Sequence, residues 1–248
     1  MTQSEDSQSE WNFLYKLGGA AALGAVLVGV LEIIITFLPG GNTIQETVLD
    51  WFKLFQENGF MGLRDLGLLN ILLTSLAILI YFALYGTFRD DRSQPYAALA
   101  VAIALMGVEV FFATNRAFAM LALSGQYAAA ATDAQRAVLE GAGQALLSVG
   151  QSHTPGTFLG FFLSEIAGIM ISLVMLRSKI FSKLTAYVGI FGFGFLLIFE
   201  CFASFAAGVS TLALILAMFG GLLSMAWYVL IALRLFQLGQ TPVKSKLT

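Results

Sequence analysis

Residues 95–124, PYAALAVAIALMGVEVFFATNRAFAMLALS, form a long apolar stretch. At about 1.5 Å per residue, a helix over this stretch is long enough to cross the roughly 30 Å hydrocarbon core of a bilayer. Two ionisable residues, Glu109 and Arg116, interrupt it. Ionisable groups within a membrane span are costly and usually face a protein interior or a watery cavity. The stretch therefore predicts a transmembrane helix that carries charge into the interior of a helical bundle.

The rest of the chain has the same apolar character. Of its 248 residues, 58% are hydrophobic and 11% are charged, whereas a soluble domain carries about 25% charged residues. We expect an all-α integral membrane protein with one transmembrane domain at 15–237, a disordered tail at 1–14 and a flexible tail at 238–248. The six predicted spans lie at about 15–38, 62–88, 95–124, 155–176, 184–207 and 212–233.

The distribution of Lys and Arg predicts the orientation of these spans, because cytoplasmic loops carry an excess of both. One side of the bundle would carry Lys16, Arg89, Arg92, Arg177, Lys179, Lys183, Arg234, Lys244 and Lys246. The other side would carry only Lys53, Arg64 and Arg136. Nine against three predicts that both termini are cytoplasmic. No basic run is present, so nothing in the sequence indicates binding to nucleic acid.

Two loops on the predicted outer side each contain a short amphipathic helix. In the first, Thr43 and Glu46 fit a capping box, in which each side chain bonds a free backbone N–H of the first turn. The apolar face of this helix is Val48, Trp51, Phe52 and Phe55. In the second, at about 133–149, Thr132 and Gln135 fit the same motif. We expect both helices to lie on the membrane surface, and a lid over a cavity is the alternative for the first.

Carboxylates recur in the predicted spans. Glu32, Glu165 and Glu200 each lie in a different span, and helix rise places them in the middle or outer half of the membrane. The candidate residues for binding a ligand or an ion are Glu32, Arg64, Asp65, Asn70, Glu109, Asn115, Arg116, Glu165 and Glu200. They come from five spans, so they predict a shared acidic region.

The set has more acids than bases, with five carboxylates against two arginines. An unpaired arginine at membrane depth is costly, so we expect Arg116 to contact Glu109 or a glutamate of another span. The remaining acids would need a proton, a bound cation or a cationic ligand to neutralise them. The sequence therefore predicts an acidic pocket open to the outside. The alternative is a polar network that only fixes the packing of the helices.

Several kinds of site are excluded by residue type. His153 is the only histidine and is expected in a loop, and Cys201 is the only cysteine. Haem and zinc sites usually need His or Cys. No phosphate-binding loop, dinucleotide fingerprint or nucleophile elbow is present. We therefore expect no cofactor, although Ca²⁺ or Mg²⁺ on clustered carboxylates remains chemically open.

Three segments together resemble a family of small bacterial integral membrane proteins that is known only as a domain of unknown function. They are residues 63–90, LRDLGLLNILLTSLAILIYFALYGTFRD, the Asn115-Arg116 pair, and the basic turn RSKIFSK at 177–183. The resemblance covers most of the chain. It implies a multi-pass protein of the bacterial inner membrane with about six helices, and it brings no activity and no catalytic residue.

Three functions fit the sequence. The first is a membrane protein, or carrier, whose outward-facing acidic pocket binds a proton, a cation or a small cationic or lipidic ligand. The second is a non-catalytic accessory or assembly subunit of a larger membrane complex, or a homo-oligomer. The third is an intramembrane enzyme acting on a lipid, with a glutamate as general acid or base. No nucleophile or metal ligand accompanies the acids, which disfavours the enzyme.

Overall fold

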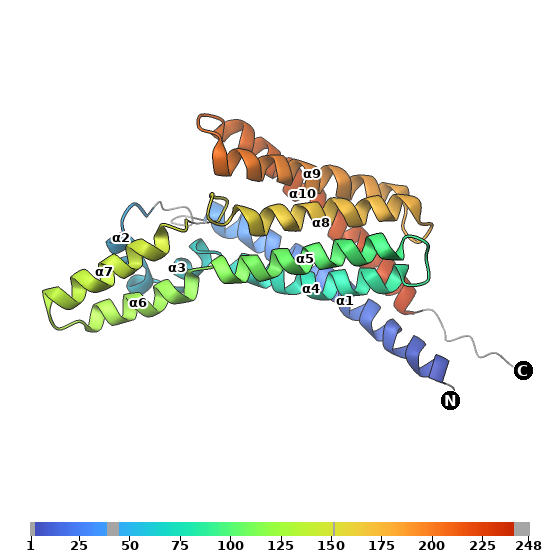
Figure 1. Cartoon of the computed structure of the whole chain (residues 1–248), viewed down its shortest axis with the longest axis horizontal. Helices are drawn as coiled ribbons and strands as arrows, with labels where there is room; N and C mark the ends of the chain where they lie inside the picture. The colour runs from blue at the N-terminus through green and yellow to red at the C-terminus, as the bar shows by residue number, and fades with distance from the viewer. Residues whose placement is uncertain (1–2, 39–44, 151, 241–248) are drawn as a thin grey trace, which may run out of the picture.

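The structure is a computed structural model that describes residues 3–38, 45–150 and 152–240. In these ranges the chain is all-helical, without strands (Figure 1). Six helices are long and apolar enough to cross a membrane, which agrees with the predicted class. These spans lie in α1 (Gln3–Phe37, from Ser9), α4 (Leu68–Phe88), α5 (Gln94–Thr114, continued through α6 to Ala129), α8 (Phe158–Arg177), α9 (Lys183–Phe205) and α10 (Ser210–Gly239). The shorter helices are α2 (Val48–Glu57), α3 (Gly59–Asp65), α6 (Ala117–Ala129) and α7 (Asp133–Leu147).

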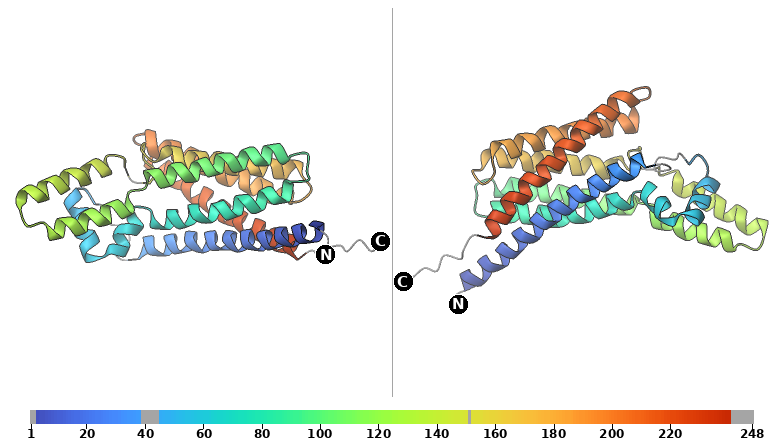
Figure 2. Two further views of the ribbon diagram at one scale, coloured as in Figure 1. Left: turned by 60° about the horizontal axis from the view of Figure 1, so that its bottom comes forward. Right: turned by 180° about the vertical axis from the view of Figure 1, so that it is seen from behind.

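The six long helices form a closed ring. Each packs mainly against two others, in the order α1, α4, α5, α8, α9, α10 and back to α1 (Figures 1 and 2). Small residues allow α1 to approach its neighbours closely. Ala22 and Ala25 are buried, and a Cβ atom at Gly18 would clash with the side chain of Ala83 on α4. The bundle core is therefore continuous around the ring.

The four shorter helices form a separate cluster at one end of the bundle, which we call the lobe (α2, α3, α6 and α7). The opposite end of the bundle holds the first turns of α1 and the last turns of α10 (Figure 1). The lobe has its own apolar core, built from Val48, Trp51, Phe52, Phe55, Leu66, Ala117 and Met120. The apolar face of α2 is thus buried against α6, although the sequence led us to expect it on a membrane surface.

Two of the predicted spans are broken where the bundle meets the lobe. The stretch 95–124 was expected as one span, but it divides at Asn115 and Arg116 into α5, which lies in the ring, and α6, which lies in the lobe. The stretch 62–88 divides into α3 and α4 at Gly67, whose φ of 96° is a left-handed conformation that glycine adopts at little cost. Both breaks therefore lie at the base of the lobe.

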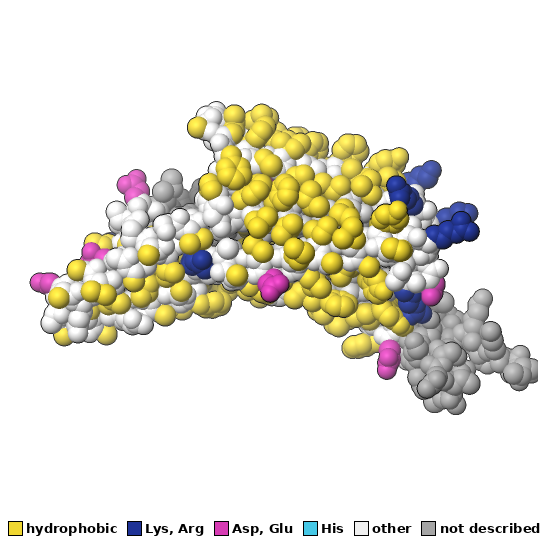
Figure 3. Space-filling model, viewed as in Figure 1, with side chains coloured by type: hydrophobic (Ala, Val, Ile, Leu, Met, Phe, Trp, Pro, Cys, Tyr) yellow, Lys and Arg dark blue, Asp and Glu magenta, His cyan; other side chains and the backbone are white. Residues whose placement is uncertain are grey.

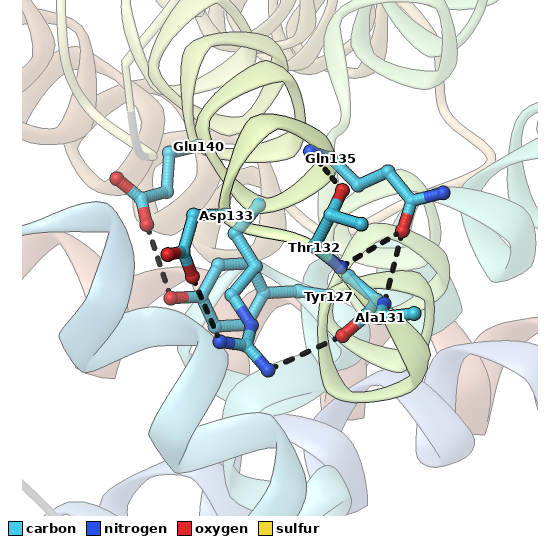
Figure 4. A network of polar contacts seen from close by, with 8 residues as sticks. Tyr127, Ala131, Thr132, Asp133, Gln135 and Glu140 are labelled. Carbon is cyan, nitrogen blue, oxygen red and sulfur yellow. Dashed lines mark hydrogen bonds and ion pairs between the residues drawn. The ribbon is translucent and has the colours of Figure 1, made fainter.

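A polar network closes the connection between α6 and α7 (Figure 4). The backbone N–H groups of Ala131 and Thr132 donate to Oε1 of Gln135, and the N–H of Gln135 donates to the hydroxyl of Thr132. This is the capping box predicted for α7, and it is confirmed. One turn further along, the hydroxyl of Tyr127 donates to Glu140 at 3.0 Å. The network holds α6 and α7 as an antiparallel pair.

Two local predictions differ from the structure. Thr43 lies outside the described residues, and α2 begins at Val48 with a capping box made by Thr47 and Asp50 instead. These two residues have the same three-residue spacing, one turn later in the chain. The second difference is at the N-terminus. Helix α1 starts at Gln3, so the described part of the predicted disordered tail is helical. The predicted C-terminal tail lies outside the described residues from 241 onward.

Candidate functional site

The candidate residues do not meet in a single pocket. The structure divides them among an ion pair at the base of the lobe, a hydrogen-bonded seam at the two helix breaks, an exposed position on α5, and a region between α8 and α9 that holds Glu165 and Glu200.

The ion pair joins α1 to α3. Nη2 of Arg64 lies 2.6 Å from Oε1 of Glu32, and Nη1 lies 2.9 Å from Oδ1 of Asp65. The hydroxyl of Thr36 also contacts Arg64. The Arg64 side chain is only 7% exposed, whereas Glu32 is 45% exposed. Burial raises the pKa of Asp65 above its ordinary value, and the hydrogen bond and charge of Arg64 partly offset this rise. One guanidinium thus pairs with two carboxylates, and the group carries one excess negative charge when both acids are ionised.

The seam joins the two helix breaks. Nδ2 of Asn115 donates to the carbonyl oxygen of Leu66 at 3.0 Å, while its Oδ1 accepts the N–H of Ala117 at 3.0 Å. Asn70 donates to the hydroxyl of Ser152 at 3.4 Å, so the loop before α8 joins the same region. Asn115 therefore caps α6 and ties the α5–α6 break to the α3–α4 break. Asn70 and Asn115 hold segments together here.

Arg116 does not pair with a carboxylate of the described chain, contrary to our expectation. Its Nη1 donates to the carbonyl oxygens of Ala113 at 2.8 Å and of Asn115 at 3.3 Å. The helix break is the physical reason, because it frees carbonyl groups at the end of α5 and turns Arg116 toward them. Arg116 thus lies at the break between α5 and α6 and not within a continuous helix.

Glu109 lies on the exposed side of α5. The exposed large side chains of the same helix are Tyr96, Leu99, Met106 and Phe112, at helical spacing. Glu109 is therefore part of the stripe that faces lipid or another membrane helix, and it takes no part in an interior site. Figure 3 shows how few acidic side chains interrupt the apolar surface of the bundle.

Glu200 forms a pair with His153. Nδ1 of His153 lies 2.6 Å from Oε2 of Glu200, and the hydroxyl of Ser204 donates to Oε1 at 3.3 Å. The imidazole packs between the rings of Phe161 and Phe199, with centroid distances of 4.3 and 4.9 Å. Glu200 is 2% exposed and His153 is 37% exposed. One end of this pair is thus enclosed, and the other end is accessible from outside the bundle.

Glu165 lies on α8, within electrostatic reach of Glu200, Tyr81 and Tyr228. The residue is partly buried; its Oε2 atom is enclosed and has no hydrogen-bond partner among the described residues. An ionised carboxylate left without a donor in a protein interior is costly.

This arrangement favours a proton over a metal ion. In the part of the chain that the structure describes, no three His, Cys, Asp or Glu side chains lie close enough to hold a metal. A hard divalent cation needs six or more oxygen ligands or bound waters, and Glu165 and Glu200 alone supply few.

His153 is the residue of this arrangement that the sequence analysis placed in a loop and did not include among the candidates. Its neighbours in sequence, GQSHTPG, have the composition of a turn, and nothing in them indicates Glu200, which lies 47 residues later. The one signal in the sequence was that this single histidine precedes a span that carries a glutamate, Glu165. Backbone geometry adds a second signal, because His153 has a positive φ of 62°, which is uncommon outside glycine.

No protein-family model matches this chain, and no curated protein or solved structure matches it either.

Proposed function

We propose that this is a multi-pass protein of the bacterial inner membrane that binds a proton at an outward-facing acidic site made by Glu165 and Glu200. His153 is the group through which the proton enters. The observation that carries the proposal is the 2.6 Å contact between His153 and Glu200, which joins an accessible imidazole to an enclosed carboxylate. Imidazole is the side chain best suited to exchanging protons near neutral pH.

The direction of access follows from the two ends of the bundle. Lys and Arg side chains gather at the end opposite the lobe (Figure 3), as cytoplasmic loops do. His153 precedes α8 on the lobe side, where Arg64 also lies. The proposal therefore places the lobe outside the cytoplasm and both termini inside. It also agrees with the bacterial inner-membrane family that the sequence resembles.

The proton has a short path within the site. It passes from His153 to Glu200 across one hydrogen bond, and Glu165 lies within electrostatic reach of Glu200. Two carboxylates close together in a low-dielectric interior cannot both be ionised without a large cost. Binding one proton removes that repulsion, so the protonation state couples α8 to α9 at their outer ends. A proton-responsive membrane protein, or a carrier driven by that proton, follows from this coupling.

The test compares infrared difference spectra, recorded between neutral and acidic pH, for the protein in lipid nanodiscs. A carboxyl group that takes up a proton gives a new band for its C=O stretch. We expect Glu165→Gln and Glu200→Gln to lose part of that band and His153→Asn to change the pH at which it develops. Glu57→Gln, at an exposed position of the lobe, is the matched control. A band unchanged in both Glu165→Gln and Glu200→Gln would contradict the proposal.

One observation favours the second candidate function, a subunit of a larger membrane complex. Glu109 lies on the exposed stripe of α5, where an ionisable side chain in lipid is costly and a neighbouring helix with a polar group would lower that cost. The measurement is photocrosslinking from an unnatural residue at Met106, one turn away on the same stripe. A crosslink to a second protein chain, lost in Glu109→Leu, would support this function.

A further inference from the structure

Arg116 is a cation at a position where the membrane surface is expected. It follows directly after α5, whose 21 residues span about 31 Å at 1.5 Å per residue, close to the thickness of the hydrocarbon core. The exposed side chains of Phe112 and Phe118 flank it in sequence. The length of α5 therefore puts Arg116 at headgroup depth.

The guanidinium group has donors to spare. Only Nη1 is bonded, to the two carbonyl oxygens at the end of α5. Nε is enclosed without a partner, and Nη2 has no recorded partner in the described ranges. An enclosed N–H of a charged group without an acceptor is costly, so the structure calls for an acceptor atom beside Nε.

A small cavity lies beside this group. Its volume is about 10 Å³, and its lining includes Asn115, Arg116, Gly150, Ser152 and Thr157. A volume of this size holds one water-sized atom. The hydroxyl of Ser152 accepts a hydrogen bond from Asn70, which leaves its own proton free to donate. The positive end of α6 begins at the same point. The cavity therefore presents donors and positive charge, without a carboxylate.

We propose that Arg116 binds a phosphate group, with one phosphate oxygen in this cavity and a second on Nη2. The planar guanidinium group can donate two parallel hydrogen bonds, which suits two oxygens of one phosphate. The source is the headgroup of a membrane phospholipid, because the exposed stripe through Leu99, Met106 and Phe112 leads along α5 to Arg116 and offers an apolar path for the acyl chains. Free inorganic phosphate has the same oxygens but gains nothing from that stripe.

The experiment measures the thermal unfolding midpoint of the full chain in detergent. The added probes are short-chain phosphatidylglycerol, the matching diacylglycerol without phosphate, and inorganic phosphate. We expect phosphatidylglycerol to raise the midpoint and the other two to have little effect at equal concentration. Losing charge-assisted hydrogen bonds should weaken the apparent affinity of Arg116→Gln by about tenfold or more. Arg116→Lys keeps the charge but loses the two-pronged guanidinium geometry. Its apparent affinity should lie between those of the wild type and Arg116→Gln.

The matched control is Arg136→Gln, since Arg136 is also a lobe arginine but bonds Asp133 and the carbonyl oxygen of Ala130. This variant should respond to phosphatidylglycerol as the wild type does. Equal responses of Arg116→Gln and wild type would overturn the proposal. Equal stabilisation by diacylglycerol would show that the acyl chains alone are bound and would contradict the phosphate site. Equal stabilisation by inorganic phosphate would contradict a phospholipid as the source of the phosphate. Should Arg116→Gln fail to fold, the comparison of Arg116→Lys with Arg136→Gln decides.

Discussion

The imidazole of His153 shares a 2.6 Å hydrogen bond with the carboxylate of Glu200, 47 residues away in sequence. The bond fixes a loop residue with a positive φ against the outer end of α9. It also links an exposed imidazole to an enclosed carboxylate. Disturbing either partner should therefore change both the stability of the bundle and its response to pH.

We predict that His153→Asn destabilises the protein by about 1.5–3 kcal/mol, because a hydrogen bond to a charged group is lost and Glu200 is left enclosed. Asparagine is chosen because it tolerates the left-handed backbone conformation better than most residues. The measurement is chemical unfolding in detergent. Ser204→Ala, which removes only the 3.3 Å bond, should cost less. If the two variants cost the same, the pair is not a strong contact.

Arg64→Gln should lower the stability by about 2 kcal/mol. A fully buried pair that loses one partner costs roughly 3–5 kcal/mol, and the 45% exposure of Glu32 reduces that value because water screens the charge. The surface pair of Lys53 and Glu57, at 3.8 Å, provides the control. Lys53→Gln should have almost no effect on unfolding, and a loss as large as that of Arg64→Gln would count against our assignment of the ion pair.

Asn115→Ala should loosen the lobe more than the bundle. It removes the bond to the carbonyl oxygen of Leu66 and the N-terminal cap of α6, and each loss is worth about 1 kcal/mol. Limited proteolysis should therefore cut the α6–α7 hairpin faster in this variant than in wild type, with the six long helices still protected. Ser148→Ala, at the exposed end of α7, should leave the cutting rate unchanged. Faster cleavage between α8 and α9 instead would contradict the prediction.

The start of α2 should respond to acid. The hydroxyl and the backbone N–H of Thr47 hold the pKa of Asp50 below its ordinary value. A depressed carboxyl pKa stabilises the folded state above the ordinary value of about 4, and this contribution is lost as pH falls through the lowered pKa. Thr47→Ala should raise the pKa of Asp50 toward the ordinary value. An NMR titration of Asp50 in both proteins would measure it, and identical pKa values would refute the capping interpretation.

The sidedness of the bundle can be tested with single cysteines in a Cys201→Ala background. Residues introduced at Lys53 and Arg136 should react from outside the cell with an impermeant thiol reagent, whereas one at Lys179 should react only after the membrane is opened. This follows from the nine-to-three distribution of basic residues. Labelling of the Lys179 position in sealed cells would show the opposite topology, in which His153 lies on the cytoplasmic side.

The fold was predictable where apolar length alone decides. The six spans follow from runs long enough to cross a bilayer, and the capping box at Thr132 follows from a local pattern of donors and acceptors. The division of 95–124 was not predictable from hydropathy, because α6 is almost as apolar as α5 and continues in the same stretch. Only the tertiary bond from Asn115 to Leu66 and the apolar core of the lobe make the break favourable.

The burial of the candidate acids could not be predicted from the sequence. Glu200 is buried and Glu165 is partly buried, whereas Glu109 is exposed. Helical periodicity does not separate the two faces of α5, since apolar residues cover both in a membrane. The pairing of His153 with Glu200 depends on a loop conformation, and no local pattern specifies a contact between residues so far apart.

The closed order of the ring has a consequence for biosynthesis. α1 is made first, yet one of its two neighbours, α10, is made last. Until α10 is inserted, the face of α1 that includes Gly19 meets lipid, where Phe236 later packs. A nascent chain stopped after α9 is therefore an open arc with two unsatisfied edges. We expect quality-control proteases to recognise that arc, so that truncation before Ser210 shortens the lifetime of the whole protein in cells.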